Sequence, residues 1–249
     1  MSETHLLGRK RSLAQIQTMS NTHDHSLAHS TSVPENLMAR NIKPRIAASE
    51  IIMSNMRDDR DQLPSNLHPH EFLIQMLRKE SIVVEAQSFD QLDIFQQPTA
   101  EEIEAYSFDV IGAVRSGDLE TLKKVHEEGR PLKCSNQFGE SLLHLACRKQ
   151  KVSVVRFLVE DAGVPLTVCD DFGRTPLHDA CWTPAPNFEL VDLIVSKCPD
   201  LLFVKDRRGH SPLFYARRDH WDVWITHLAK QGSTLSPRLL RCQPPPSEG

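Results

Sequence analysis

One turn-and-helix motif occurs three times in the second half of the chain, and this repetition constrains the fold more than any other feature. The copies read FGESLLHLAC at 138–147, FGRTPLHDAC at 172–181 and RGHSPLFYAR at 208–217. Their glycines, Gly139, Gly173 and Gly209, lie 34 and 36 residues apart. Self-similarity at a period of about 20–50 residues is the signature of stacked repeats. We therefore predict a solenoid in which each repeat packs on its neighbours.

The residues of each copy predict a tight turn followed by a helix. The glycine permits positive φ in the turn, and the hydroxyl of Ser141, Thr175 or Ser211 can cap the helix that follows. Pro176 and Pro212 then occupy the first helical position, where the missing N–H costs nothing.

A second apolar helix follows in two of the copies, at 152–158 and 188–194. A degenerate earlier copy begins at 113–119, 33 residues before the corresponding Ala146. The predicted unit is a turn and two helices, and the earliest copy lacks the turn signature, which is typical of a terminal repeat.

The segment Gly-Arg-Thr-Pro-Leu-His-Asp-Ala at 173–180 resembles the G-x-T-P-L-H-x-A motif of the ankyrin repeat family. The resemblance covers 103–231 and implies an all-α fold, an ankyrin-type helix-turn-helix repeat solenoid. It also implies a non-enzymatic scaffold or adaptor that binds a partner protein on its concave face and turn tips. Two residues depart from the motif: Leu142 replaces the usual proline and Phe214 replaces the usual histidine.

We predict four parts of the chain: a disordered region at 1–70, a helical extension or N-terminal cap at 71–102, the repeat domain at 103–231 and a disordered tail at 232–249. The first part has no aromatic residue before Phe72, so it cannot bury enough apolar surface to offset its ordering entropy. A second hypothesis treats 71–102 as a peptide-like segment that docks on the repeats and can be released. Trp221 and Trp224 are expected to cover the last core face.

The overall composition argues against several classes of protein. The net charge of −4 gives no pull toward nucleic acid or an anionic membrane. No apolar run reaches the 18 or so residues of a membrane helix, and the apolar core of a secretory signal is missing from the N-terminal sequence. The six cysteines form no C-x-x-C pair, so we expect a reducing compartment, cytoplasmic or nuclear.

Catalytic and metal chemistry is the main alternative to protein binding. His144 with Cys147, and His178 with Cys181, resemble a nucleophile and its base or a set of zinc ligands. Both residue types recur at the 34-residue period, however, so structural positions explain them better. In the ankyrin family that histidine usually bonds turn backbone, and a buried cysteine acts as a small apolar residue. We therefore predict no catalytic residue, no metal and no cofactor.

The candidate partner-binding surface combines turn tips with exposed positions of each first helix. Its residues are aromatic or basic, the types enriched at interface hot spots, and the arginines favour an acidic peptide or surface as the partner. The predicted set is Phe138, Arg148, Phe172, Arg174, Trp182, Arg208, Tyr215, Arg217 and Arg218.

Two short patterns near the N-terminus suggest further roles. The basic cluster at 9–12 (Arg-Lys-Arg-Ser) is consistent with nuclear import, which would make the chain a nuclear regulatory ankyrin protein, or with a kinase site. Three histidines at 23–29 provide weak metal ligands without a rigid scaffold. A solvated charged segment explains the first pattern equally simply.

Overall fold

The computed structural model describes residues 67–92 and 97–241, which belong to one compact unit of the chain. Several predictions fall outside these residues: the basic cluster at 9–12, the histidines at 23–29, and the disorder expected for 1–66 and 242–249. The predicted disorder of 232–241 is wrong, because these residues continue the last helix.

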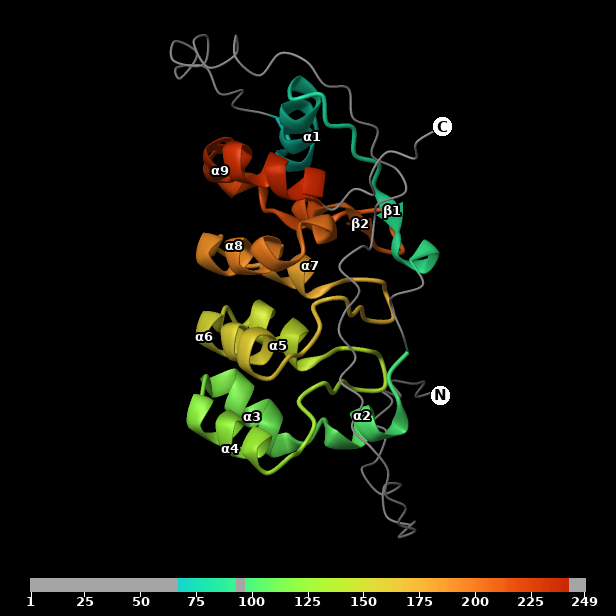
Figure 1. Cartoon of the computed structure of the whole chain (residues 1–249), viewed down its shortest axis with the longest axis vertical. Coiled ribbons are helices and arrows are strands. Elements are labelled where there is room, and N and C mark those ends of the chain that lie inside the picture. The colour runs from blue at the N-terminus through green and yellow to red at the C-terminus, as the bar shows by residue number, and fades with distance from the viewer. Residues whose placement is uncertain (1–66, 93–96, 242–249) are drawn as a thin grey trace, which may run out of the picture. The chain divides into compact units, whose positions relative to one another are not determined.

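Helices dominate the described part of the chain, as the repeat pattern predicts. Repeat one contains α3 (Phe108–Ser116) and α4 (Leu119–Glu127). Repeat two contains α5 (Leu142–Arg148) and α6 (Val152–Arg156), which η4 (Phe157–Asp161) extends. Repeat three contains α7 (Pro176–Cys181), α8 (Phe188–Lys197) and η5 (Pro199–Phe203). Repeat four contains η6 (Pro212–Tyr215), η7 (Arg218–His220) and α9 (Trp221–Arg241). These pairs stack in chain order (Figure 1).

A tight turn precedes the first helix of repeats two, three and four; we call these turns finger two (135–141), finger three (169–175) and finger four (205–211). Gly139, Gly173 and Gly209 have φ of 76°, 75° and 78°, so each uses the left-handed conformation that glycine tolerates. A Cβ on Gly139 would also lie 2.7 Å from the carbonyl oxygen of Cys169 in the next finger. The predicted turn role of these glycines is confirmed.

The helix that follows fingers two and three starts with a capping box. The backbone N–H of Ser141 donates to His144 Nδ1 at 3.1 Å, and that of Thr175 donates to His178 Nδ1 at 2.9 Å. Each histidine uses its Nε2 to donate to a carbonyl of the next finger, Arg174 at 2.8 Å and His210 at 3.1 Å. The two histidines therefore fasten successive repeats together.

A continuous apolar core runs between the helix pairs. Leu142, Leu143, Leu177 and Ile194 are completely buried in it. At about 1.5–3 kcal/mol for each buried side chain of this size, this core supplies the main stabilisation of the stack. The alanine of the repeated motif is also buried, as at Ala146.

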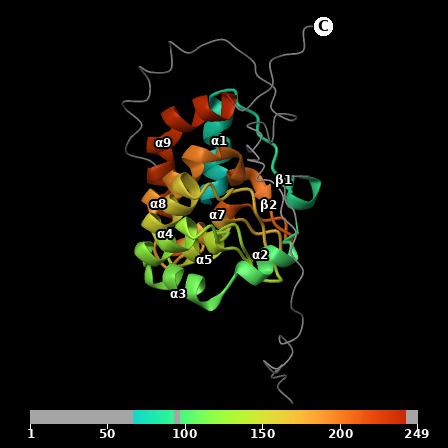
Figure 2. The ribbon, with the colours of Figure 1, turned by 60° about the horizontal axis from the view of Figure 1, so that its bottom comes forward.

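The segment before the repeats is located differently from our expectation. Helix α1 (Pro69–Lys79) packs against α9, at the C-terminal end of the stack, and Figures 1 and 2 both show them side by side. The prediction of an N-terminal cap is therefore wrong for α1, although its helix was expected. Leu73 and Leu77 are buried there because α9 leaves an apolar face that the repeats do not cover.

From α1 the chain passes along the fingers toward repeat one. Strand β1 (Gln87–Ser88) pairs in parallel with β2 (Val204–Lys205), and η3 (Phe89–Gln91) follows it. Helix α2 (Ala100–Ala105) begins with a capping box formed by Thr99 and Glu102. Both figures place β1 and α2 on the side opposite α4 and α8 (Figures 1 and 2). None of the helices in the described ranges is long and apolar enough to cross a membrane.

Candidate protein-binding surface

The three fingers are held side by side by their backbones. The N–H of Asp171 donates to the carbonyl of Phe138 at 2.8 Å, and that of Arg207 donates to the carbonyl of Phe172 at 2.9 Å. Within each finger a short polar side chain closes the turn; Asp170 Oδ1, for example, accepts from the N–H groups of Phe172 and Arg174. The finger tips therefore form a row with a fixed backbone.

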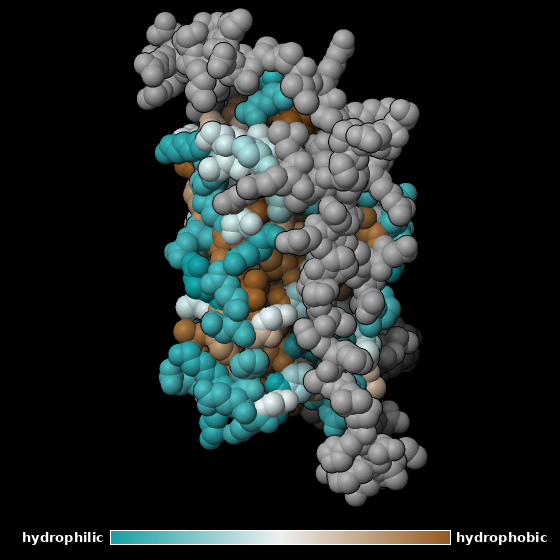
Figure 3. All heavy atoms as spheres, viewed as in Figure 1, coloured by the Kyte–Doolittle hydropathy of each residue, from teal (hydrophilic) through white to brown (hydrophobic). Residues whose placement is uncertain are grey.

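Aromatic side chains stand exposed on this framework. Phe138 and Phe172 occupy equivalent tips and are 53% and 49% exposed, and Trp182, at the end of α7, is 49% exposed. The face in Figure 3 shows hydrophobic residues reaching the surface between hydrophilic ones along the middle of the stack. The alternative to partner contact is that the two phenylalanines pack under their turns. About half of each side chain is nevertheless exposed.

Two of the predicted arginines already have carboxylate partners. Arg148 forms ion pairs with Glu140 and, at 3.5 Å, with Asp179 of the next repeat. Arg174 Nη2 lies 2.6 Å from Asp170 Oδ2, and its guanidinium lies 5.1 Å from the centre of the Phe172 ring. Burial raises the pKa of Asp179 to about 6, although Arg148 and Arg174 oppose this shift. These two arginines support the surface more than they offer charge to a partner.

Two other predicted arginines are exposed without an ion pair to any residue in the described ranges. They are Arg208, at the tip of finger four, and Arg217, after η6. Arg218 is also exposed and lies over the Trp221 ring, 5.8 Å from its centre. Among the predicted arginines, those that remain exposed without an ion pair therefore lie in repeat four.

Tyr215 links finger four to its first helix. It is half-buried, and its hydroxyl donates to Asp206, whose other oxygen accepts from the N–H groups of Arg208 and His210. Burial, followed by the Asp206 carboxylate, raises the pKa of Tyr215 to about 12. The phenol therefore serves mainly to hold the turn beside Arg208.

The histidines and cysteines considered for chemistry are built into the core. Burial lowers the pKa of both His144 and His178 to about 4. The Nε2 atoms of both rings form hydrogen bonds with backbone carbonyls of the fingers. Burial also raises the pKa of the Cys147 and Cys181 thiols. A protonated, buried thiol is a poor nucleophile and a poor metal ligand. Residues 67–92 and 97–241 contain no cluster of three histidine, cysteine or acidic side chains suited to a metal.

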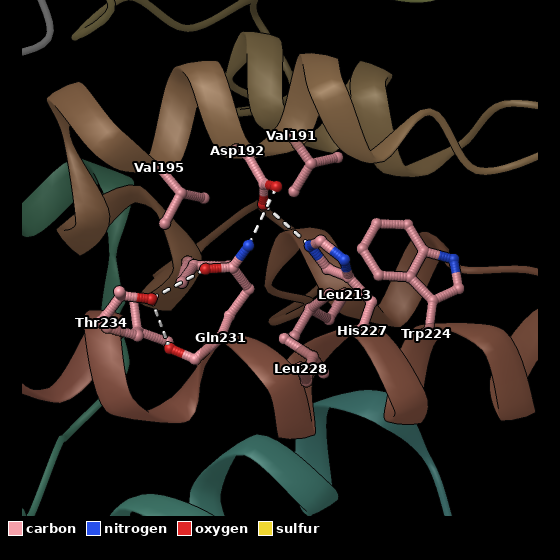
Figure 4. Close-up of a pocket in the computed structure, with 11 residues that line it drawn as sticks. Val191, Asp192, Val195, Leu213, Trp224, His227, Leu228, Gln231 and Thr234 are labelled. Carbon is pink, nitrogen blue, oxygen red and sulfur yellow. Dashed lines mark hydrogen bonds and ion pairs between the residues drawn. The ribbon is translucent and has the colours of Figure 1, made fainter.

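A small cavity lies between α8 and α9, away from the fingers. Asp192 accepts hydrogen bonds from His227 Nε2 at 2.8 Å and from Gln231 Nε2 at 3.1 Å, as Figure 4 shows. The His227 ring also stacks on Phe188 with centres 4.0 Å apart. These polar groups satisfy one another and join the two helices, so the cavity has a packing role.

Two comparisons place the repeats among known proteins. Residues 110–202 match the family model described as ankyrin repeats, in 3 copies. This segment carries ankyrin repeats. The resemblance drawn from the motif is confirmed, and ankyrin repeats are generally protein–protein interaction modules. The match ends before finger four, where the motif is most altered.

A curated relative matches a shorter stretch. The Eye-specific diacylglycerol kinase of Drosophila melanogaster is 33% identical over 60 residues. The matched stretch is 24% of this chain and 4% of the relative. A match to so small a share of the kinase gives no evidence that this chain has the catalytic activity of that kinase.

Sequence reasoning missed two features of this surface. It grouped all the arginines as available charge, whereas Arg148 and Arg174 are paired. It also did not anticipate that Phe89 lies against Gly173, so closely that a Cβ there would collide with the ring. The glycine at 173 was the available signal, but nothing local identifies a ring 84 positions earlier as its neighbour.

Proposed function

We propose that the chain is a non-enzymatic scaffold or adaptor that binds a partner protein through its finger tips and first helices. The observation that carries this proposal is the row of half-exposed aromatic tips at Phe138 and Phe172 on hydrogen-bonded fingers. A fixed backbone lowers the entropy lost on binding, and exposed aromatic rings supply most of the energy at typical hot spots.

The charge distribution supports an acidic partner segment that reaches repeat four. Arg208 and Arg217 supply charge-assisted donors, with Trp182 of the preceding repeat as an apolar contact. Arg148, Arg174 and Tyr215 hold this surface in place through their carboxylate partners. A reducing compartment, cytoplasmic or nuclear, suits the free thiols of Cys134, Cys147, Cys169 and Cys181.

Affinity capture from a native extract tests the proposal. The full chain is compared with an Arg208→Glu/Arg217→Glu variant and with a Phe138→Ala/Phe172→Ala variant, and captured proteins are quantified by mass spectrometry. We expect the principal partner to fall at least about tenfold with either variant, because rim charges and aromatic anchors both contribute.

A matched control reverses two charges elsewhere. Lys123→Glu/Lys124→Glu changes net charge equally on α4, the outer helix of repeat one. Capture should be preserved with this control. Equal loss with control and test variants, or full capture by both test variants, would rule out the proposed surface.

A further inference from the structure

Repeat four lacks a part that repeats two and three possess. In those repeats a hydroxyl at the start of the first helix meets a histidine three residues later: Ser141 Oγ lies 2.8 Å from His144 Nδ1, and Thr175 Oγ1 lies 2.9 Å from His178 Nδ1. In repeat four the hydroxyl is Ser211, but the residue three positions later is Phe214. The repeat therefore has the hydroxyl without its imidazole.

Helix α1 supplies the missing imidazole. His70 Nδ1 lies 2.8 Å from Ser211 Oγ, although the two residues are 141 positions apart. The His68 and His70 rings both pack on Phe214, with ring centres 4.6 Å apart in each case. The capping arrangement of repeat four is thus divided between two distant segments of the chain.

The rest of the segment fits the same surface closely. Leu73 and Leu77 of α1 are buried against repeat four, and a Cβ on Gly232 would lie only 3.0 Å from the sulfur of Met76. Further along, β1 pairs with β2.

Phe89, the next residue after β1, lies on Gly173 beneath the guanidinium of Arg207, which is 5.8 Å from the ring centre. Helix α1, strand β1 and the Phe89 ring therefore each pack closely against the repeats.

We propose that the surface formed by η6, β2 and the face of α9 that the repeats do not cover is a docking site that residues 67–92 of a second copy of this chain can fill. The fit is already displayed by the chain's own segment, and every copy carries both the segment and the surface. Exchange of identical segments conserves all contacts and is a low-cost route to a dimer. His70 is the residue by which the site recognises this segment.

A labelled synthetic peptide of residues 67–92 tests the docking site. The receptor is the full chain with Leu73→Ala/Leu77→Ala, which weakens its own α1 but leaves the surface intact. We expect this receptor to bind the peptide at least about tenfold more tightly than the wild-type chain does, because the wild-type site is occupied. A wild-type chain that binds equally well would show that the peptide attaches elsewhere and would overturn the proposal.

Two substitutions test the role of His70. A peptide with His70→Ala should bind the receptor about tenfold more weakly, through the loss of one hydrogen bond and one ring contact. Adding Phe214→His to the receptor restores a histidine within repeat four, so the difference between the two peptides should shrink to about twofold. Equal binding of both peptides to the original receptor would overturn the proposed recognition.

Mixing full chains tests the second copy as occupant. The Leu73→Ala/Leu77→Ala chain offers an open surface, and a Ser211→Ala/Phe214→Ala chain offers an intact segment. Light scattering should show more dimer in the mixture than in either chain alone, and no increase would exclude exchange. If circular dichroism shows that the leucine variant has lost its helices, His68→Ala/His70→Ala replaces it in both experiments.

Discussion

Repeats two and three start their first helices with their own residues, whereas repeat four uses a residue from another segment. In repeat three the histidine that meets Thr175 is His178, within the same helix. In repeat four the histidine that meets Ser211 is His70 of α1. The first helix of repeat four is also shorter, a single 3-10 turn from Pro212 to Tyr215. Local sequence therefore determines the inner repeats, and a long-range contact completes the outer one.

The difference also affects how each region depends on its neighbours. His144 and His178 each bond the finger of the following repeat. In the part of the chain that the structure describes, α1 rather than another repeat packs on α9. In this chain, His70 of α1 supplies to Ser211 the imidazole that the motif of repeat four lacks.

The largest expected effect distinguishes an inner repeat from α1. Leu177→Ala removes a completely buried side chain from repeat three and should lower the free energy of unfolding by about 3–5 kcal/mol. Leu73→Ala should instead release mainly α1. Hydrogen exchange should rise across 142–194 in the first variant, but chiefly in 69–79 in the second. Equal spreading of exchange in both would show that α1 is integral to the stack.

A second prediction concerns a buried carboxylate in the outer region. Asp200 of η5 precedes finger four at the position that the buried Val164 occupies before finger three, 36 residues earlier. Burial raises the pKa of Asp200 to about 6, so the ionised form destabilises the fold above that pH. Asp200→Val should increase stability at pH 8 by at most about 3 kcal/mol.

The pH dependence of that gain checks its cause. Because protonation removes the penalty, the gain measured by urea unfolding should shrink as the pH falls from about 6 toward 4. Asp161→Val, at an exposed position, is the control and should change stability little. A gain that is independent of pH would mean that improved packing, rather than charge burial, stabilises the variant.

Lowering the pH should have a smaller effect, which is to weaken the docking of α1. Burial lowers the pKa of His70 to about 4, and the nearby His68 and Lys205 lower it further. Burial also lowers the pKa of His68; Glu71 opposes this shift and His210 adds to it. Docking should therefore be strongest above pH about 6.5 and weaken as the pH falls toward 4, since released imidazoles bind protons more readily.

Proton NMR titration of the imidazoles measures this difference directly. His70 should titrate near 4 in the wild-type chain, as should His178, and the pKa of His70 should return toward 6.5 in the Leu73→Ala/Leu77→Ala chain. His178 should stay near 4 in both. A wild-type His70 that titrates at 6.5 would contradict the buried contact.

Much of the fold follows from short-range signals in the sequence. Gly139 and Gly173 mark the turns, Ser141 and Thr175 mark the helix starts, and the period identifies the stack, because each feature depends on residues within a few positions. The capping box of Thr99 with Glu102 likewise depends on residues three positions apart. The continuation of α9 to Arg241 did not follow from the sequence, and the helix includes Pro237 in its interior.

The candidate site was predictable in kind but not in its charge balance. Exposed rings at Phe138 and Phe172 follow from their place beside a turn glycine. The pairing of Arg148 with Asp179 requires two repeats to be in contact, and the position of α1 requires a contact across 141 residues. Phe214 was the one local sign, because it leaves Ser211 without a histidine, but it does not identify the histidine that replaces it.

A double-mutant cycle between His70 and Ser211 tests the divided repeat most directly. The free energy of unfolding is measured by urea for His70→Ala, Ser211→Ala and the double variant, with His70 and Thr175 as the control pair. We predict a coupling of about 1 kcal/mol between His70 and Ser211, and additivity within about 0.3 kcal/mol for the control. Additive effects of His70→Ala and Ser211→Ala would contradict the claim that α1 completes repeat four.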